Sequence, residues 1–274
     1  MNGLSYSDVY LIPQYSEVAS RKDVDTSVEI LPGLKVDVPV ISANMDTITD
    51  GFFASQMYRA GGVGAVHRFM SIEDSVKEFR KVEGECLVSV GVNADSMARA
   101  AALYEAGATY FIVDVAHGHS AAVRSTIKDL RKLSHIWIMA GNVATGDAVR
   151  DLVSWGVDSI KVGIGPGAVC TTKSITGVTV PQFSAVLECA EALKADHGSA
   201  TLIADGGLTE IGDIAKALAA GAHAVMSGRM FAGCYGTCGP TLNGKKVYRG
   251  MASRDAMATI RAVELLPTPE GKSI

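Results

Sequence analysis

The stretch that decides the fold is residues 136–165, IWIMAGNVATGDAVRDLVSWGVDSIKVGIG. Two of its runs, 136–143 and 159–165, are apolar on both faces, which is typical of strands in a parallel sheet covered by helices. Between them, residues 145–156 place apolar side chains at helical spacing and end in Gly156, a residue type that commonly closes a helix. The stretch therefore predicts one strand-helix-strand unit.

The same unit repeats along the chain. Further runs rich in Val, Ile and Ala lie at 38–44, 62–67, 86–92, 110–116, 201–207 and 224–230, and amphipathic segments lie at 71–83, 95–107 and 210–221. Eight predicted strands fit a closed barrel better than an open doubly wound sheet, which normally has about five or six. A length of 274 residues is also close to the roughly 250 typical of such barrels. We predict an α/β protein, a (β/α)8 TIM barrel, in which residues 1–274 form a single domain.

Composition excludes several classes of function. The net charge is −4 and no run of Lys or Arg exceeds two residues, so the chain lacks the basic surface of a nucleic-acid or membrane-surface binder. No apolar run reaches the roughly 18 residues of a membrane span. Five cysteines, an odd count, in a chain without an apolar leader indicate free thiols in a reducing compartment. We expect a cytoplasmic protein with neither nucleic acid nor membrane as partner.

Polar residues gather where the predicted strands end. The carboxyl ends of barrel strands carry the active site. Each such residue could instead cap the following helix, but their agreement across the strands favours a nucleotide site. They are Asn44, Asp46, His67, Arg68, Asp114, His117, Asn142, Gly165 to Gly167, Asp205 to Gly207, and Ser227 to Arg229.

One cysteine occupies a position that suits a nucleophile. In KVGIGPGAVCTTKSITGVTVPQ, residues 161–182, Cys170 follows a strand and a glycine-rich turn. The thiolate is the nucleophilic form of cysteine, and backbone amides in such a turn supply positive potential. A small buried filler in a tight turn is the alternative. Cys189, within 183–195, is expected in the core, and Cys234 and Cys238 lack the second pair that a zinc site requires.

Several segments together resemble one family. They are GLSYSDVYLIPQYS (3–16), SANMDT (42–47), DVAHGHS (114–120), MAGNVATG (139–146), the cysteine loop (161–182), ADGG (204–207) and YRGM (248–251). The chain resembles the family of IMP dehydrogenases and GMP reductases, and the resemblance extends over nearly its whole length. It implies a barrel that binds a purine nucleoside monophosphate, with a cysteine that attacks C2 of the purine.

Three features favour a reductase within that family. Gly-Pro-Gly with Cys-Thr-Thr in the cysteine loop resembles reductases, as does Asn44, and the segment 71–83 leaves no room for the regulatory module that most dehydrogenases insert. DVAHGHS and YRGM are closer to dehydrogenases. We predict a GMP reductase, which converts GMP to IMP and ammonia with NADPH.

Three alternatives stay open. One is an IMP dehydrogenase without the regulatory module, which oxidises IMP to XMP with NAD. Another is a non-catalytic homologue that binds a purine nucleotide. The third is a flavin-dependent barrel oxidoreductase, because phosphate loops after strands seven and eight also hold flavin.

The resemblance implies the roles of individual residues in catalysis. Cys170 is the nucleophile, and Thr172 and Glu270 form a relay that protonates the leaving amino group. The carbonyls of Gly165, Gly167 and Cys170 form the potassium site of dehydrogenases, although we expect no tightly held K+ here. Residues 163–182 form the active-site loop, and 232–274 form a partial flap.

It also implies the binding residues and a homotetramer. The cofactor is expected against Asp114, Asn142, His67 and Arg68, with the first two flanking its nicotinamide. The nucleotide is expected against Ala168, Asp205, Gly206, Gly207, Gly228, Arg229, Gly250, Met251 and Ser253. Two departures concern the phosphate. Ala168 replaces a phosphate-binding Ser of the family, and Arg229 replaces a Gly or Ser. We expect the Arg229 guanidinium to compensate for the lost hydroxyl.

Overall fold

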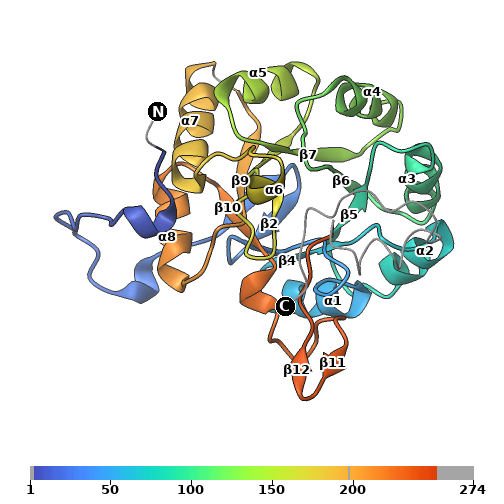
Figure 1. The fold of residues 1–274 in the computed structure, drawn as a ribbon, viewed down its shortest axis with the longest axis horizontal. Helices are drawn as coiled ribbons and strands as arrows, with labels where there is room; N and C mark the ends of the chain where they lie inside the picture. The colour runs from blue at the N-terminus through green and yellow to red at the C-terminus, as the bar shows by residue number, and fades with distance from the viewer. Residues whose placement is uncertain (1–2, 197, 252–274) are drawn as a thin grey trace.

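Eight parallel strands close into a barrel in the computed structural model, which describes residues 3–196 and 198–251. The strand order is β10-β3-β4-β5-β6-β7-β8-β9, so that only the first and last strands of the barrel meet out of sequence (Figure 1). The predicted fold is confirmed, and each strand lies within one predicted run. Their bounds are β3 Val40–Ser42, β4 Val63–Val66, β5 Cys86–Val90, β6 Tyr110–Asp114, β7 Trp137–Val143, β8 Ser159–Val162, β9 Thr201–Asp205 and β10 Ala224–Ser227.

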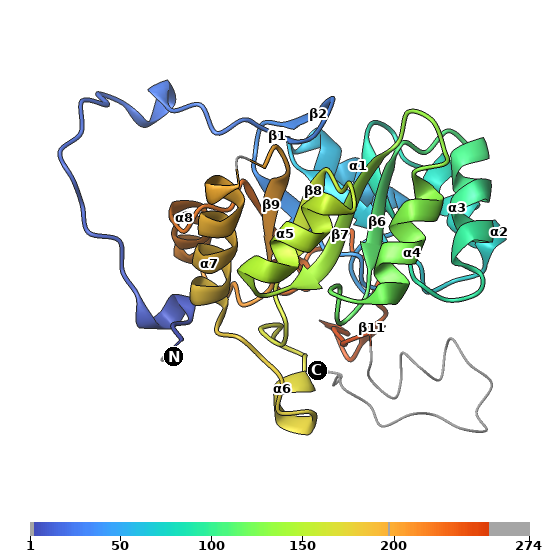
Figure 2. The same cartoon turned by 90° about the horizontal axis from the view of Figure 1, so that it is seen from above.

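Helices surround the barrel (Figure 2). They are α1 Gly51–Arg59, α2 Ile72–Arg80, α3 Ser96–Glu105, α4 Ala121–Leu130, α5 Gly146–Ser154, α7 Gln182–Ala195 and α8 Ile211–Ala219, with a one-turn α6, Thr172–Ile175, in the loop after β8. Side chains of Asp50, Ser71, Ser120 and Thr145 cap the amino ends of α1, α2, α4 and α5. After α1, α3, α5 and α8 the chain turns through glycines with positive φ, Gly61, Gly107, Gly156 and Gly221, which explains the repeated Ala-Gly and Trp-Gly turns of the sequence.

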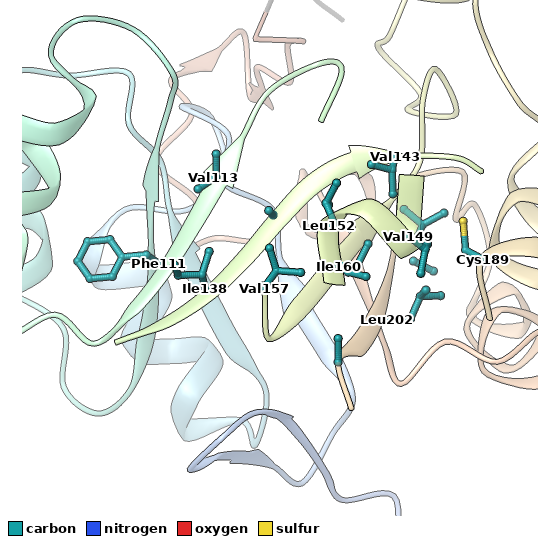
Figure 3. Packing of buried hydrophobic residues seen from close by; sticks show 14 of the residues in the cluster. Phe111, Val113, Ile138, Val143, Val149, Leu152, Val157, Ile160, Cys189 and Leu202 are labelled. Carbon is teal, nitrogen blue, oxygen red and sulfur yellow. The ribbon is translucent and has the colours of Figure 1, made fainter. Parts of the chain in front are cut away.

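The larger hydrophobic core lies between the strands and the outer helices (Figure 3). Phe111 on β6 and Ile138 on β7 are fully buried there, together with Leu152 of α5. Cys189 of α7 belongs to the same cluster and has no exposed surface, so its expected core position is confirmed. No helix of the described segments is long and apolar enough to cross a bilayer.

A hairpin that sequence analysis missed closes the amino end of the barrel. Strands β1 (Val28–Leu31) and β2 (Leu34–Val36) pair antiparallel and pack Ile30, Leu31 and Leu34 against the inner side chains of the barrel. Thr201 at the start of β9 donates a hydrogen bond from its hydroxyl to the Ile30 carbonyl, 2.6 Å away. The strands have only four and three residues, which is too short for a periodic pattern to predict them. The carboxyl end of the barrel is the end left for a ligand.

Smaller elements complete the described chain. They are the 3-10 turns η1 Tyr6–Asp8, η2 Arg21–Asp23 and η3 Arg229–Phe231, and the hairpin β11 Thr241–Leu242 with β12 Lys245–Lys246. Between η1 and β1, residues 9–27 form an extended arm that stands away from the barrel (Figure 2). Tyr10, Ile12 and Tyr15 of this arm are 86%, 79% and 89% exposed.

Candidate active site

A cavity of about 360 Å³ opens at the carboxyl ends of the barrel strands. It is lined by residues from the ends of β3, β4, β6, β7, β8, β9 and β10, by the cysteine loop and by residues 248–251. Most of the residues expected in the site meet here although they are distant in sequence. These are Arg68, Asp114, Asn142, Gly165, Gly167, Cys170, Thr172, Asp205, Gly206, Gly228, Gly250 and Met251.

Four of the residues with an expected role are absent from the lining, and so are three other strand-end candidates, Asp46, His117 and Ser227. Ala168 packs against a hydrophobic cluster that includes Val169, and Gly207 follows one residue behind the lining residue Gly206. Arg229 begins η3 and is exposed, whereas His67 is buried with its Nδ1 accepting a hydrogen bond from the Phe69 amide at 3.2 Å. Burial lowers the pKa of His67 to about 4, so this imidazole is neutral at neutral pH. Ser253 and Glu270 lie outside the described residues.

The cysteine loop begins at a strand end that only glycine allows. Gly163 has φ +149°, and a Cβ atom there would lie 2.1 Å from the Asp205 carbonyl oxygen. This close approach brings the end of β8 against the end of β9. The loop then turns so that the Cys170 amide donates to the Gly167 carbonyl at 3.0 Å. The Cys170 thiol donates to the Thr172 hydroxyl at 3.1 Å, so the predicted nucleophile and the predicted proton donor are adjacent.

Gln182 holds the two strand ends behind this loop. It is 2% exposed, and its Nε2 donates to the carbonyls of Val162 at 2.8 Å and Asp205 at 3.1 Å. The Pro-Gln pair that closes the cysteine loop therefore has a structural basis. Pro181 precedes the first turn of α7, and the next side chain ties β8 to β9.

A buried charge network forms the floor of the cavity. Lys161 of β8 is 2% exposed, and its Nζ lies 2.7 Å from Asp114 Oδ1 and 2.6 Å from Asp205 Oδ2. Asn142 donates from Nδ2 to the same Asp205 oxygen at 2.9 Å and to the Gly163 carbonyl at 2.7 Å. Four neighbouring strands, β6 to β9, thus each supply one polar side chain to a single connected network.

The network favours the charged forms of Asp114 and Lys161. Burial opposes charge on Asp114, but the ammonium of Lys161, together with Arg68 and Asn44, more than offsets burial and leaves the pKa of Asp114 below its usual value. Burial also opposes charge on Lys161, yet the two carboxylates raise its pKa overall. The Asn142 Oδ1 is buried without a hydrogen-bond partner in the described chain, so it can accept one from a bound ligand.

Another part of the cavity wall is formed by Tyr248, Gly250 and Met251, and Tyr248 packs in one hydrophobic cluster with Val169 of the cysteine loop. The Arg249 guanidinium forms an ion pair with Asp46, which follows β3, and the Asp46 amide donates to Met251 Sδ at 3.3 Å. Tyr248 is 7% exposed and lines the cavity, and burial raises its pKa to about 12, so the phenol stays neutral. Asp46 therefore positions the segment that resemblance assigns to the purine base.

Sequence reasoning missed Lys161 and Tyr248 as site residues. Lys161 stands inside a run otherwise typical of a strand buried on both faces, and lysine is almost never fully buried unless paired. A lysine in a strand expected to be buried on both faces was therefore the sign of a buried ion pair. Tyr248 begins the YRGM motif (248–251), but its residue type alone did not indicate a role in the site.

The fold and the site together define a class: a (β/α)8 barrel that presents a cysteine on a glycine-rich loop to a polar cavity at the carboxyl ends of its strands. Comparison with known proteins is more specific, since the family described as "IMP dehydrogenase / GMP reductase domain" matches residues 3–268. The chain belongs to the IMP dehydrogenase / GMP reductase family and is an oxidoreductase of that family.

Curated relatives agree with this assignment. An inosine-5'-monophosphate dehydrogenase of Cryptosporidium parvum is 35% identical, with 93% of this chain and 75% of the relative covered. Enzymes of the same name from Bacillus subtilis (strain 168) and Nitrosopumilus maritimus (strain SCM1) are 33% and 30% identical, and 80% of each is covered. The Bacillus alignment runs over 392 positions, more than the 274 residues of this chain, so that relative has segments without a counterpart here.

Proposed function

We propose that the protein oxidises C2 of IMP to give XMP, through a covalent bond to Cys170 and with NAD as hydride acceptor. The observation that carries the proposal is the placement of Cys170 in a cavity whose floor is the network of Lys161, Asp114 and Asp205. The sequence alone favoured a GMP reductase. The three relatives described above are all named IMP dehydrogenases, and they support the dehydrogenase alternative better than the reductase.

Cys170 supplies the chemistry at the purine. Its thiolate adds to C2 of IMP, and the hydrogen on C2 then leaves with its electron pair, which gives a thioimidate bonded to the enzyme. The nicotinamide ring, when bound, is the acceptor of that hydride. Water attacks C2 of the thioimidate and the C–S bond breaks, so that XMP leaves, the thiolate is restored and one proton of the water passes to solvent. The Thr172 hydroxyl, 3.1 Å from Cys170 Sγ, is placed to exchange a proton with the thiol.

Binding of the nucleotide follows from the remaining lining. The Gly228 backbone amide carries no side chain beside it and is the proposed phosphate donor, whereas the Gly206 amide already donates to the Met226 carbonyl at 3.2 Å. Tyr248 would add its hydroxyl, because a Cβ atom at Gly228 would lie 3.0 Å from that oxygen. Asp205 is the proposed acceptor for the ribose hydroxyls. Gly250 and Met251 would contact the base.

The nicotinamide fits the other side of the network. Asp114 and Asn142 line the cavity, and the unpartnered Oδ1 of Asn142 can accept a hydrogen bond from a carboxamide. Arg68, which also lines the cavity, supplies a cation that would attract the phosphates of a dinucleotide. The potassium site at Gly165, Gly167 and Cys170 stays a prediction from resemblance.

GMP reduction is the second candidate. The observation in its favour is the direct contact between Cys170 and Thr172, because loss of the 2-amino group of GMP requires a proton donor at the cysteine. In that reaction NADPH would deliver hydride to C2, and IMP and ammonia would be the products.

One experiment separates the candidates. The purified protein is incubated with IMP and NAD, and separately with GMP and NADPH, and the absorbance of the reduced nicotinamide is followed. We expect formation of NADH and XMP in the first mixture only. Consumption of NADPH with release of ammonia would reverse the assignment. Nucleotide binding without turnover in either mixture would identify a non-catalytic homologue, and a yellow protein would indicate a flavin enzyme.

We also propose that the protein is a cytoplasmic homo-oligomer, as resemblance implies for a tetramer. All five cysteines are free, which suits a reducing compartment. The arm of residues 9–27 exposes Tyr10, Ile12 and Tyr15, which a second subunit could cover. Sedimentation of the purified chain measures the state directly.

A further inference from the structure

Among the residues that the structure describes, Lys161 is the one that forms ion pairs with both of the carboxylates proposed to bind the two ligands. Its ammonium lies 2.7 Å from Asp114 on β6 and 2.6 Å from Asp205 on β9. The side-chain exposures of Lys161, Asp114 and Asp205 are 3%, 19% and 18%, so the lysine lies deepest of the three, although all three line the cavity. Gly141 makes room for it, because a Cβ atom there would lie 2.7 Å from Lys161 Cβ.

We propose that Lys161 is a positioning residue that serves the nucleotide site and the cofactor site at once, by holding Asp205 and Asp114 ionised and in place. The proposal rests on the proposed function, which assigns Asp205 to the ribose and Asp114 to the nicotinamide side. Lys161 itself need not touch either ligand. Its role is to keep two buried carboxylates available as hydrogen-bond acceptors within one small cavity.

Electrostatics explains why a single cation has to serve both acids. Two carboxylates within hydrogen-bond distance of one nitrogen are close enough to repel each other strongly in a buried setting. Without the ammonium, one of the pair takes up a proton to relieve the repulsion, as in carboxylate dyads. Asn142 donates to Asp205 but carries no charge, so it cannot replace the lysine.

The other ionisable groups around the pair do not duplicate this role. The Arg68 guanidinium lies beside Asp114, with Nη2 3.5 Å from its backbone carbonyl, and does not reach Asp205 in the described contacts. The Tyr6 and Tyr248 hydroxyls interact electrostatically with Asp205. Burial raises the pKa of both, so they remain neutral near neutral pH. If ligand affinity becomes dependent on pH when Lys161 is removed, we therefore assign that dependence to protonation of the Asp114 and Asp205 pair.

The test measures binding rather than turnover. Dissociation constants for IMP and for NAD are measured separately by calorimetry, from about pH 6 to about pH 8.5, on wild type and on Lys161→Met. We expect the variant to bind each ligand roughly ten- to a hundredfold more weakly near pH 6, the effect of losing a charged acceptor. Its affinity for IMP, relative to wild type, should recover by about tenfold as pH rises and the pair ionises.

A double variant removes one of the two carboxylates together with the cation, and with it the repulsion between the carboxylates. In Lys161→Met/Asp114→Asn only Asp205 remains charged, so IMP affinity should return to within about threefold of wild type and lose its new pH dependence. NAD affinity should stay weak, because Asp114 is gone. This separation also keeps the test valid if the single variant folds poorly.

Lys216→Met is the matched control. This lysine pairs with Asp213 at 3.0 Å on α8, away from the cavity, and its removal should leave both affinities unchanged. Equal IMP affinity in Lys161→Met and wild type across the pH range would overturn the inference, as would a double variant that fails to recover IMP binding. Failure of wild type to bind IMP or NAD at all would refute the proposed function instead.

Discussion

Replacing Gln182 with methionine tests whether the cysteine loop depends on the tie between β8 and β9. Methionine has nearly the same length and shape, so the change removes the amide without leaving a large void. Two donated hydrogen bonds disappear, to the carbonyls of Val162 at 2.8 Å and Asp205 at 3.1 Å. Both acceptors lie at strand ends where water has little access.

The magnitude follows from the two acceptors. A buried carbonyl left without its partner costs about 1–3 kcal/mol, so two would cost about 2–6 kcal/mol. The Gln182 Oε1 is itself buried without a partner in the described chain, and its removal returns about 1–2 kcal/mol. We therefore expect Gln182→Met to lower the free energy of unfolding by about 2.5 kcal/mol, the middle of a range of about 0–5 kcal/mol.

The free energy of unfolding of the variant and of wild type is measured by urea denaturation at neutral pH. The dependence of that free energy on urea concentration is compared between the two proteins. The control is Gln14→Met in the exposed arm, where the amide donates to the Ile12 carbonyl at 3.3 Å, and a change within about 0.5 kcal/mol is expected. Because the tie supports the loop of Cys170, kcat of Gln182→Met should fall while the KM for the nucleotide changes less. A variant as stable and as active as wild type would show that the strand ends need no tie.

Four further changes address single features of the molecule. Cys170→Ser should abolish turnover and leave nucleotide affinity within about tenfold, since the thiol forms the covalent bond but contributes little to ground-state binding; wild-type kcat would contradict the mechanism. Arg229→Ala should weaken binding of the monophosphate by about 1.5–3 kcal/mol and spare the nucleoside if the guanidinium reaches the phosphate, and equal losses for both would exclude that role. Ile30→Ala should destabilise the fold by about 2–5 kcal/mol, because the side chain is fully buried under the barrel; urea unfolding that matches wild type would show that the hairpin is not required. Burial lowers the pKa of His67 in the folded chain to about 4, against a usual value near 6.5. Between about pH 4 and pH 6.5, His67 is therefore protonated in the unfolded chain but not in the folded chain. Stability is then complete above about pH 6.5 and falls by about 3 kcal/mol as pH drops to about 4, and His67→Gln should remove that part of the urea-measured pH dependence.

The periodic elements of this fold could be read from sequence because they repeat a local rule. A run apolar on both faces, a helix with one apolar side and a closing glycine recur around the barrel, and each predicted run contains one observed strand. The hairpin of β1 and β2 escaped because its strands of four and three residues are defined by packing into the barrel rather than by their own pattern.

The choice between dehydrogenase and reductase shows where short motifs stop being informative. Gly-Pro-Gly, Cys-Thr-Thr and Asn44 favoured the reductase, whereas the similarity of whole chains favours the dehydrogenases. Asn44 has a local role that either enzyme could use: it is buried and donates to the Ser89 hydroxyl at 3.0 Å. Asn44 also lines the cavity beside Asp114, a residue proposed to bind the cofactor in either enzyme, so it says little about the direction of the reaction.

The sequence by itself determined the barrel, the loop that carries Cys170 and the polar character of the strand ends, because each depends on residues that are neighbours along the chain. Only the tertiary structure decided that two of those polar groups, Asp114 and Asp205, pair with the same cation, Lys161. Lys161 lies between Asp114 and Asp205 because β6 and β9 flank β7 and β8 in the closed sheet, and no spacing in the sequence indicates that contact. Burial then gives the contact its strength, since the attraction between charges grows as water is excluded from around them.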